Sequence, residues 1–389
     1  MKSLRLLLSN PRYFAAAWVF ASINILFGTW AIYIPTVQAN LMIDKSELGI
    51  AIFFLSLGVF TIFPLASTII NKVGVGKATC YGVVLSSFAA LLPIIAPSYY
   101  SLMAGLFLFG AANGFTDISM NTLVTELEKK DNQKIMSASH GFFSLGGVLA
   151  GLGSFMIGPI NNPTLHMAMA VALVLVVHVI FYNYIVGLKA APVDKGSFSL
   201  KVFKPLVLLG VISFVAMGSE GAIVDWSGLF LKEISMAPEA LWGAGFLGFQ
   251  ITMTLGRFLG DAVSAKIGPV RIVAYGACAA ILGYVLVLSS TTYLAIAGFA
   301  LIGLGFSVMV PEVFRIGGNV KGIDSSKGVS FIAGSGYAGF LCAPPLLGLL
   351  ADRYSLLACF LVLLGCALLI FVATFGLTRQ KKKTSSVSS

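Results

Sequence analysis

Apolar residues fill long runs along most of the 389-residue chain, and short polar stretches separate these runs. A run of roughly 20 apolar residues can cross the hydrocarbon core of a bilayer as a helix. Membrane strands would be about 10 residues long with polar residues at alternate positions, a pattern not seen here. We therefore predict an all-α membrane protein with twelve transmembrane helices, at residues 12–38, 46–71, 77–96, 99–125, 135–160, 164–188, 204–231, 239–264, 270–290, 293–316, 328–350 and 355–377.

The longest polar connection contains KAAPVDKGSFSLK and lies at the middle of the chain. It divides the predicted helices into two sets of six. We expect an N-terminal six-helix bundle at 1–188, a cytoplasmic linker at 189–203, a C-terminal six-helix bundle at 204–378 and a basic cytoplasmic tail at 379–389.

Two segments of the first half recur in the second. NKVGVGK (71–77) matches AKIGPVR (265–271), and each follows the second helix of its half. AGLFLFG (104–110) matches AGFALIG (297–303) in the fourth helices. Repeated helical halves are typical of secondary transporters, whose solute site lies near the bilayer midplane between the repeats. The repeats therefore predict two pseudo-symmetric bundles with a central site.

Composition and charge placement agree with a membrane protein. The chain is 58% hydrophobic and 10% charged, whereas soluble domains are about one quarter charged. With the N-terminus in the cytoplasm, the outer side holds Lys45, Lys232 and Arg353, and the other 22 of the 25 Lys and Arg residues lie inside. This positive-inside bias predicts cytoplasmic N- and C-termini. The net charge of +10 therefore indicates contact with anionic lipid and not with nucleic acid.

Neither a metal site nor a cofactor site is expected. The three histidines and five cysteines lack metal-ligand spacing, and no phosphate-binding Walker loop occurs. No spacing of polar residues supports an enzyme active site. We expect a protein that is not an enzyme and uses no cofactor.

Two acids interrupt the apolar run FVAMGSEGAIVDW in the seventh helix. A charged residue at the bilayer centre costs about 2.5–3.5 kcal/mol on insertion scales, so it usually faces a cavity or a partner. We predict that Glu220 lies near mid-membrane and binds a proton or a positively charged part of the solute. The alternative is a structural hydrogen bond to a neighbouring helix. Asp225 is either a second such acid or an interface residue beside the belt aromatic Trp226.

The fourth helix carries a polar stripe, because Asn113, Asp117 and Asn121 recur every four residues. The stripe predicts either solute and proton binding or hydrogen bonds between helices. His140, near the cytoplasmic end of the fifth helix, suits a proton relay, a gate or a helix cap. Asn24 in the first helix and Gln250 in the eighth are deep amides expected to face the solute.

Further charges lie near the cytoplasmic ends of helices and are expected to form gates. Arg257 and Asp261 are four residues apart, and we expect them to lock the outward-open state. Glu312 and Arg315 are three residues apart, which favours an ion pair over a substrate role. The basic loops add the remaining gating candidates, Lys72 and Lys266.

The six-plus-six helices and the basic, glycine-containing turns resemble the major facilitator superfamily. Four runs are similar to a bacterial branch that includes rhizopine-transporter-like inner-membrane proteins: SHGFFSLGG (139–147), EGAIVDW (220–226), MTLGRFLGD (253–261) and GYAGFLCAPPLLG (336–348). The resemblance implies the major facilitator fold, alternating access and a bacterial inner-membrane location. The acid that the superfamily usually carries in its basic loops is replaced by Asn71 and Ala265.

We predict a secondary active transporter that moves a small polar organic solute resembling a sugar, polyol or amino acid. We expect proton coupling and a monomer. The alternative is a multidrug or metabolite exporter working as a proton antiporter. Drug–proton antiporters of the superfamily usually carry an arginine where this chain has Leu106, which disfavours drug efflux.

Overall fold

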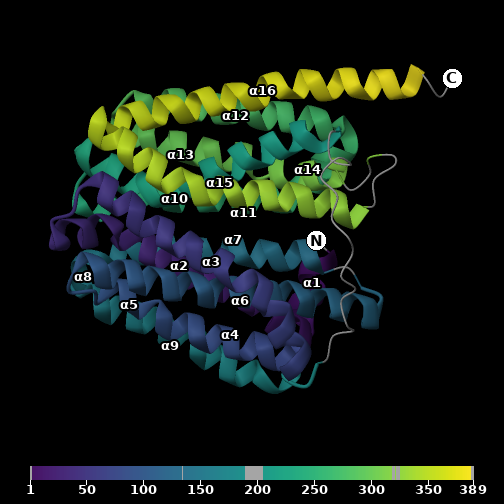
Figure 1. Cartoon of the computed structure of the whole chain (residues 1–389), viewed down its shortest axis with the longest axis horizontal. Coiled ribbons are helices and arrows are strands. Elements are labelled where there is room, and N and C mark those ends of the chain that lie inside the picture. The colour runs from purple at the N-terminus through teal and green to yellow at the C-terminus, as the bar shows by residue number, and fades with distance from the viewer. Residues whose placement is uncertain (1, 134, 189–204, 318–319, 321–324, 387–389) are drawn as a thin grey trace.

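The computed structural model describes residues 2–133, 135–188, 205–317, 320 and 325–386, which form helices joined by short turns (Figure 1). No strand occurs in these ranges, so the predicted all-α class is confirmed. The first half contains α1 (Lys2–Ser9), α2 (Pro11–Leu41), α3 (Lys45–Val73), α4 (Val75–Ala89), α5 (Leu91–Ile94), α6 (Tyr99–Asp131), α7 (Met136–Gly153), η1 (Ser154–Met156), α8 (Ile157–Ile160), α9 (Pro163–Phe181) and η2 (Tyr182–Tyr184). The second half contains α10 (Val207–Glu233), η4 (Glu239–Leu241), α11 (Ala244–Ile267), α12 (Pro269–Leu288), α13 (Thr292–Phe306), α14 (Met309–Gly317), α15 (Ser325–Arg353) and α16 (Leu356–Ser386).

The helices agree closely with the predicted spans. Within the described part of the chain, 11 helical segments are long and apolar enough to cross a membrane. The remaining predicted span, 239–264, overlaps the 24-residue helix α11 (Ala244–Ile267), which is not among these 11 segments. The tenth span is divided into α13 and α14, and Pro311 lies in the first turn of α14, where a missing N–H is tolerated.

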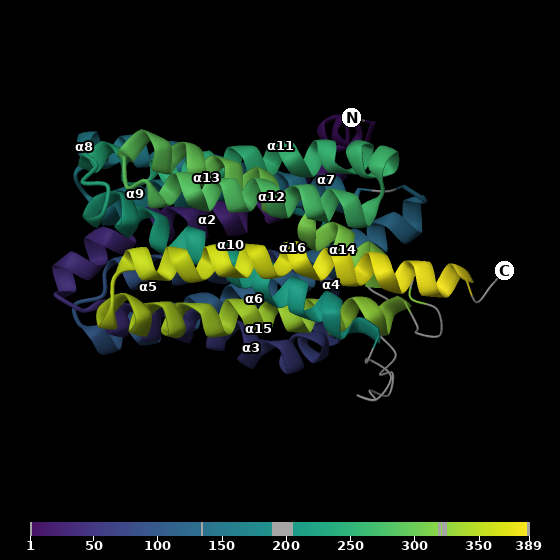
Figure 2. The ribbon, with the colours of Figure 1, turned by 90° about the horizontal axis from the view of Figure 1, so that it is seen from above.

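The two halves form separate bundles that pack side by side. In Figure 1, α2 to α9 lie in the lower part and α10 to α16 in the upper part. The main contacts between the bundles are α3 with α15, α7 with α11 and α2 with α10. Figure 2 shows α1 and the C-terminal end of α16 toward one end of the molecule, which we call the terminal end. The opposite end, where α3 begins and α15 ends, is the distal end.

Glycines of the internal sequence repeat occupy equivalent positions in the two bundles. Gly74 ends α3 and Gly268 ends α11, with φ of 90° and 89°, and each directly precedes the next helix. This left-handed region favours glycine, which lacks a Cβ. A Cβ at Gly110 would clash with the backbone of α3, and one at Gly303 would clash with the backbone of α11. The repeated glycines therefore hold equivalent helix pairs in the two bundles.

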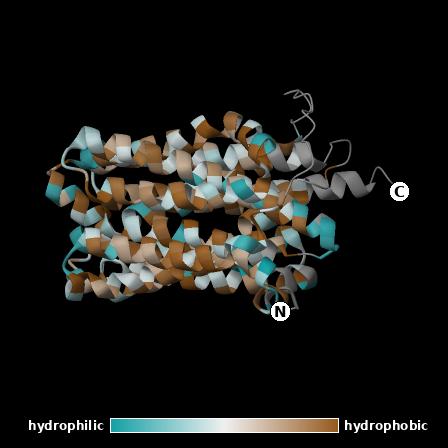
Figure 3. Ribbon diagram, turned by 90° about the horizontal axis from the view of Figure 1, so that it is seen from below, coloured by the Kyte–Doolittle hydropathy of each residue, from teal (hydrophilic) through white to brown (hydrophobic). Residues whose placement is uncertain are grey.

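Hydropathy follows this architecture. Figure 3 shows hydrophobic residues along the helices and hydrophilic ones gathered toward the two ends. Large apolar side chains on the outer helices are exposed, including Leu85 on α4, Val179 on α9, Leu282 on α12 and Val372 on α16. Such apolar surfaces suit lipid contact. The predicted linker at 189–203 lies outside the described residues, and α16 continues through Ser386 into the predicted tail.

Candidate functional site

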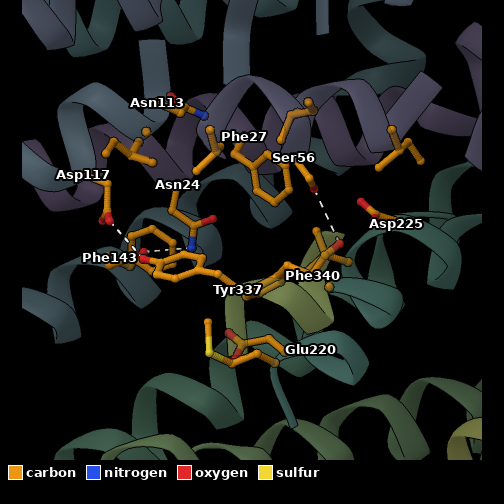
Figure 4. Close-up of a pocket in the computed structure, with 18 of the residues that line it drawn as sticks. Asn24, Phe27, Ser56, Asn113, Asp117, Phe143, Glu220, Asp225, Tyr337 and Phe340 are labelled. Carbon is orange, nitrogen blue, oxygen red and sulfur yellow. Dashed lines mark hydrogen bonds between the residues drawn. The ribbon is translucent and has the colours of Figure 1, made fainter. Parts of the chain in front are cut away.

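A cavity of about 290 Å³ lies between the two bundles (Figure 4). Its lining comes from α2, α3, α6 and α7 in the first half and from α10, α11, α14 and α15 in the second. These are the first, second, fourth and fifth predicted spans of each half. The cavity therefore lies where the repeat architecture predicts a solute site.

Most predicted solute- or proton-binding residues meet in this cavity. The lining includes Asn24, Asn113, Asp117, His140, Glu220, Asp225 and Gln250. Asn121 does not belong to the lining. Its Nδ2 donates to the Asp117 backbone oxygen at 2.8 Å and to Asp117 Oδ1 at 3.2 Å, so it supports the acid from one turn away.

Glu220 is paired with an arginine from the neighbouring helix. Arg257 Nη2 on α11 lies 3.3 Å from Glu220 Oε1 on α10, and the two side chains are 18% and 14% exposed. Arg257 Nη1 also donates to Ser144 Oγ on α7, in the other bundle, at 2.6 Å. Arg257 is thus a cavity residue that joins three helices. The expected gate with Asp261 involves a side chain that lies outside the described part of the structure.

Asp117 makes a polar contact between the bundles. Tyr337 Oη on α15 donates to Asp117 Oδ2 at 3.0 Å, as the dashed line in Figure 4 shows. Tyr337 was not among the predicted site residues. The sequence feature that could have identified it is a tyrosine within the glycine-rich helix α15. Tyrosines in membrane helices are, however, common as packing residues.

Two amides approach the same glycine on α7. Asn24 Nδ2 donates to the Phe143 backbone oxygen at 2.9 Å. A Cβ at Gly147 would lie 2.6 Å from Asn24 Nδ2 and 2.7 Å from Gln250 Cδ. Gly147 therefore lets an amide from each bundle reach the cavity wall.

Asp225 is buried, and one of its carboxyl oxygens lacks a partner. The residue is 5% exposed, and none of the described groups donates a hydrogen bond to its Oδ1. The neighbouring Trp226 is 1% exposed, so it packs inside the protein and is not a belt aromatic. The interface interpretation of this pair is therefore wrong, because this stretch of α10 packs against other helices. In Figure 4, Asp225 and Asp117 lie at opposite ends of the labelled cluster.

His140 lies in the first turns of α7 and lines the cavity toward the terminal end. Its ring packs edge-to-face on Phe20, with centroids 5.0 Å apart. The N-cap of α7 is Ile135, and no side-chain hydrogen bond caps this helix, so His140 does not act as its cap.

The remaining charged residues lie outside the cavity. Arg315 Nη1 is 2.8 Å from Glu312 Oε1, which confirms the predicted ion pair, and it also donates to Ser264 Oγ at 3.2 Å. Lys72 and Lys266 are exposed in the last turns of α3 and α11.

Contacts between the bundles close the distal end, and no sequence feature predicted them. Asp352 near the end of α15 accepts hydrogen bonds from the backbone N–H groups of Lys45 and Ser46, which begin α3. Lys45 Nζ lies 3.0 Å from Glu233 Oε2 on α10. A Cβ at Gly49 on α3 would lie 3.1 Å from the Cα of Gly348 on α15, so these backbones touch.

Aromatic side chains complete the wall. Phe27, Phe143, Phe340 and Tyr337 present apolar ring surfaces beside the charged and amide groups. Within the described residues, no cluster of three His, Cys, Asp or Glu side chains could hold a metal ion. The cavity therefore offers both polar groups and ring surfaces for recognition of a small molecule.

Comparisons with known proteins agree with this architecture. Residues 13–320 match the Major Facilitator Superfamily. The chain is 27% identical over 369 residues to the membrane protein MosC of Rhizobium meliloti, covering 94% of this chain and 90% of that protein. It is 24% identical over 402 residues to a glucose/galactose transporter of Brucella abortus, covering 94% of each. The crystal structure of a mutant of the nucleoside transporter NupG superimposes with a TM-score of 0.75 at 14% identity, covering 94% of this chain and 99% of that one.

The family match covers most of the chain, and the fold, the repeat and the relatives point the same way. The resemblance predicted from the sequence motifs is thereby confirmed. The protein is a multi-pass membrane transporter that belongs to the major facilitator superfamily.

Proposed function

We propose that the protein is a proton-driven secondary active transporter of a small polar organic solute of the sugar, polyol or amino-acid type. One observation carries the proposal: equivalent helices of the two bundles enclose a cavity that combines charges, amides and aromatic rings. A volume of about 290 Å³ is close to the lower limit of about 300 Å³ for small-molecule sites.

The polar groups suit a solute that carries several hydroxyl or amide groups. Glu220 accepts hydrogen bonds and Arg257 donates them, and the two lie side by side on one wall. Asn24 and Gln250 each offer both donor and acceptor atoms. The rings of Phe27 and Phe340 give apolar surfaces for the C–H faces of the solute. A glucose/galactose transporter and a nucleoside transporter among the similar proteins support this chemistry.

Acids in the cavity support proton coupling. Glu220 and Asp117 were predicted first and second for this role, and both line the cavity. Buried ionisable groups in membrane transporters mark ion and proton pathways. The pairing of Glu220 with Arg257 favours solute binding as its main role, because Arg257 already balances its charge.

The distal contacts support alternating access. The bonds from Asp352 to α3 and the pair of Lys45 with Glu233 hold the bundles together at that end. Rocking of the bundles would break these contacts and open the cavity distally. On the terminal side we retain the predicted gating residues, Lys72, Arg257, Asp261, Lys266, Glu312 and Arg315.

Charge placement supports a bacterial inner-membrane location with both termini in the cytoplasm. Lys45, Lys232 and Arg353 lie near the distal end, whereas Lys72 and Lys266 lie near the terminal end. The positive-inside rule then assigns the terminal end to the cytoplasm. We further propose that the transporter works as a monomer in contact with anionic lipid, without nucleic acid.

A ligand screen followed by transport measurements tests the proposal. Sugars, polyols, amino acids and organic acids are added to the purified protein, and thermal unfolding is recorded at two pH values. A bound compound stabilises the folded state by linkage. Proteoliposomes should then accumulate the stabilising compound when a proton gradient is imposed, and collapse of the gradient should stop accumulation. Stabilisation by lipophilic cations alone would instead support the exporter alternative.

A further inference from the structure

We propose that Asp225 is the residue that carries the coupling proton, and that it is protonated in the conformation described here. The inference rests on the proposed transport function and deepens it, because it separates the proton site from the solute site. It assigns Glu220 to the solute and Asp225 to the proton.

The three cavity acids differ in what surrounds them. Glu220 faces the guanidinium of Arg257 at 3.3 Å. Asp117 accepts from the Tyr337 hydroxyl and from the Asn121 amide. Asp225 is buried but receives no such donor at Oδ1 from the described residues. A buried carboxylate without counter-ion or donors is so unfavourable that the group takes up a proton and becomes neutral.

The other groups around the cavity do not compensate a charge on Asp225. From α2 and α3 the lining brings the uncharged Asn24 and Ser56. From α6 it brings Asp117, a second acid, which lies at the opposite end of the labelled cluster (Figure 4) and offers Asp225 no positive charge.

The remaining helices bring one fixed cation. α7 brings His140 and α15 brings Tyr337, whereas α11 brings Arg257. Among the described lining residues Arg257 is the one permanent cation, and Glu220 already engages it. A neutral Asp225 is therefore the arrangement that leaves no uncompensated charge at its position.

The position of Asp225 in α10 suits a residue that must be reached by water first from one side of the membrane and then from the other. It lies five residues beyond Glu220 toward the distal end, or about 7.5 Å along the helix. Farther along α10, Lys232 Nζ reaches the Pro35 backbone oxygen at 3.3 Å, a contact between the bundles. Opening the distal end must break this contact, which admits water toward Asp225. The neutral acid then releases one proton to water and becomes a carboxylate, and the reverse step restores it.

Infrared spectroscopy of the purified protein in lipid nanodiscs tests the inference without a solute. A protonated carboxyl group has a carbonyl-stretch band that is separate from those of a carboxylate and an amide. The wild-type protein should show this band at neutral pH, and alkaline titration should remove it. Asp225→Asn should lose the band, whereas Glu220→Gln and the neighbouring Ser227→Ala should keep it.

A band that persists in Asp225→Asn, or a wild-type protein without the band at neutral pH, would overturn the inference. If Asp225→Asn does not fold, Asp225→Glu provides a second test, since the longer acid should shift the band without removing it; an unshifted band would contradict the assignment. Because no solute is needed, these outcomes do not depend on the transport measurements. Failure to accumulate any tested compound would count against the proposed function alone.

Discussion

Tyr337 on α15 donates a hydrogen bond to Asp117 Oδ2 on α6 across 3.0 Å, and so joins the two bundles at the edge of the cavity. The Tyr337 ring packs edge-to-face on Phe60 and Phe63 of α3, with centroids 6.4 and 5.4 Å apart. The second bundle thus contributes the tyrosine, and the first contributes the acid and the two phenylalanines. Movement between the bundles must rearrange this cluster.

The first prediction is that Tyr337→Phe shifts the protein toward the distally open state. The substitution keeps the ring and removes a bond that is present while the distal end is closed. One such bond contributes about 1 kcal/mol, which corresponds to a roughly fivefold change in population. Maleimide labelling from the distal side, at a cysteine introduced in place of Ile52 after removal of the native cysteines, should increase.

Tyr33→Phe is the matched control for this change. Tyr33 Oη lies 2.9 Å from His166 Nδ1, but both residues belong to the first bundle. Losing that bond should lower stability without shifting the balance between the two states. Equal labelling of the two variants would show that the Asp117 contact does not hold the bundles.

Sequence patterns predicted the helices of this protein but not the contacts between its bundles. Hydropathy located the 11 segments of the described chain that are long and apolar enough to cross a membrane, because insertion in lipid demands a long apolar run. The spacing of Asn113 and Asp117 predicted a shared polar face because that spacing follows the helix itself. The link from Asp117 to Tyr337 spans 220 residues, and no local pattern encodes a separation of that length.

A second prediction concerns the first turn of α3. The Asp44 side chain accepts from the Glu47 N–H, and Asp352 of the other bundle accepts from the two N–H groups before it. These N–H groups have no partner inside the helix. Asp352→Ala should therefore weaken distal closure by about 1 kcal/mol, the usual contribution of such a cap. Distal labelling at the Ile52 position should rise.

Ser98→Ala supplies the comparison for Asp352→Ala. Ser98 Oγ accepts from the Ser101 N–H and caps α6 at the same end, but within one bundle. Its loss should lower the unfolding temperature by a similar amount and leave labelling unchanged. If both variants label alike, the cap from Asp352 serves stability and not closure.

The third prediction is that Gly147→Ala impairs solute binding. The added methyl group would meet Asn24 Nδ2 at 2.6 Å and Gln250 Cδ at 2.7 Å, so both amides must move. The solute concentration that gives half of the maximal thermal stabilisation should rise at least several-fold. Gly365→Ala on α16 is the control, because nothing lies within 4 Å of the added group. Unchanged solute binding in Gly147→Ala would show that Asn24 and Gln250 do not contact the solute.

The partners of Arg257 show where inference from helix spacing stops. Asp261 lies four residues away on the same helix, and that spacing predicted a local pair. The structure brings Glu220, 37 residues earlier, within 3.3 Å of the guanidinium, a contact that this spacing did not predict. Helices pack by shape along their whole length, and a long side chain such as arginine can reach partners on either side. The local pair Glu312–Arg315 was predictable because one helical turn contains both residues.

The final prediction separates the stability of the Glu220–Arg257 pair from its role in binding. Glu220→Gln or Arg257→Gln alone leaves one nearly buried charge without its partner, which costs about 3 kcal/mol or more. The double variant removes both charges and should recover much of that loss in thermal unfolding, while solute binding stays abolished in all three. The more exposed pair Lys45–Glu233, whose side chains are 24% and 32% exposed, is worth about 1 kcal/mol or less and provides the reference double-mutant cycle. If the double variant is destabilised by the full sum of the single changes, the two charges do not stabilise each other. Solute binding that survives in the double variant would assign the solute wall to other residues.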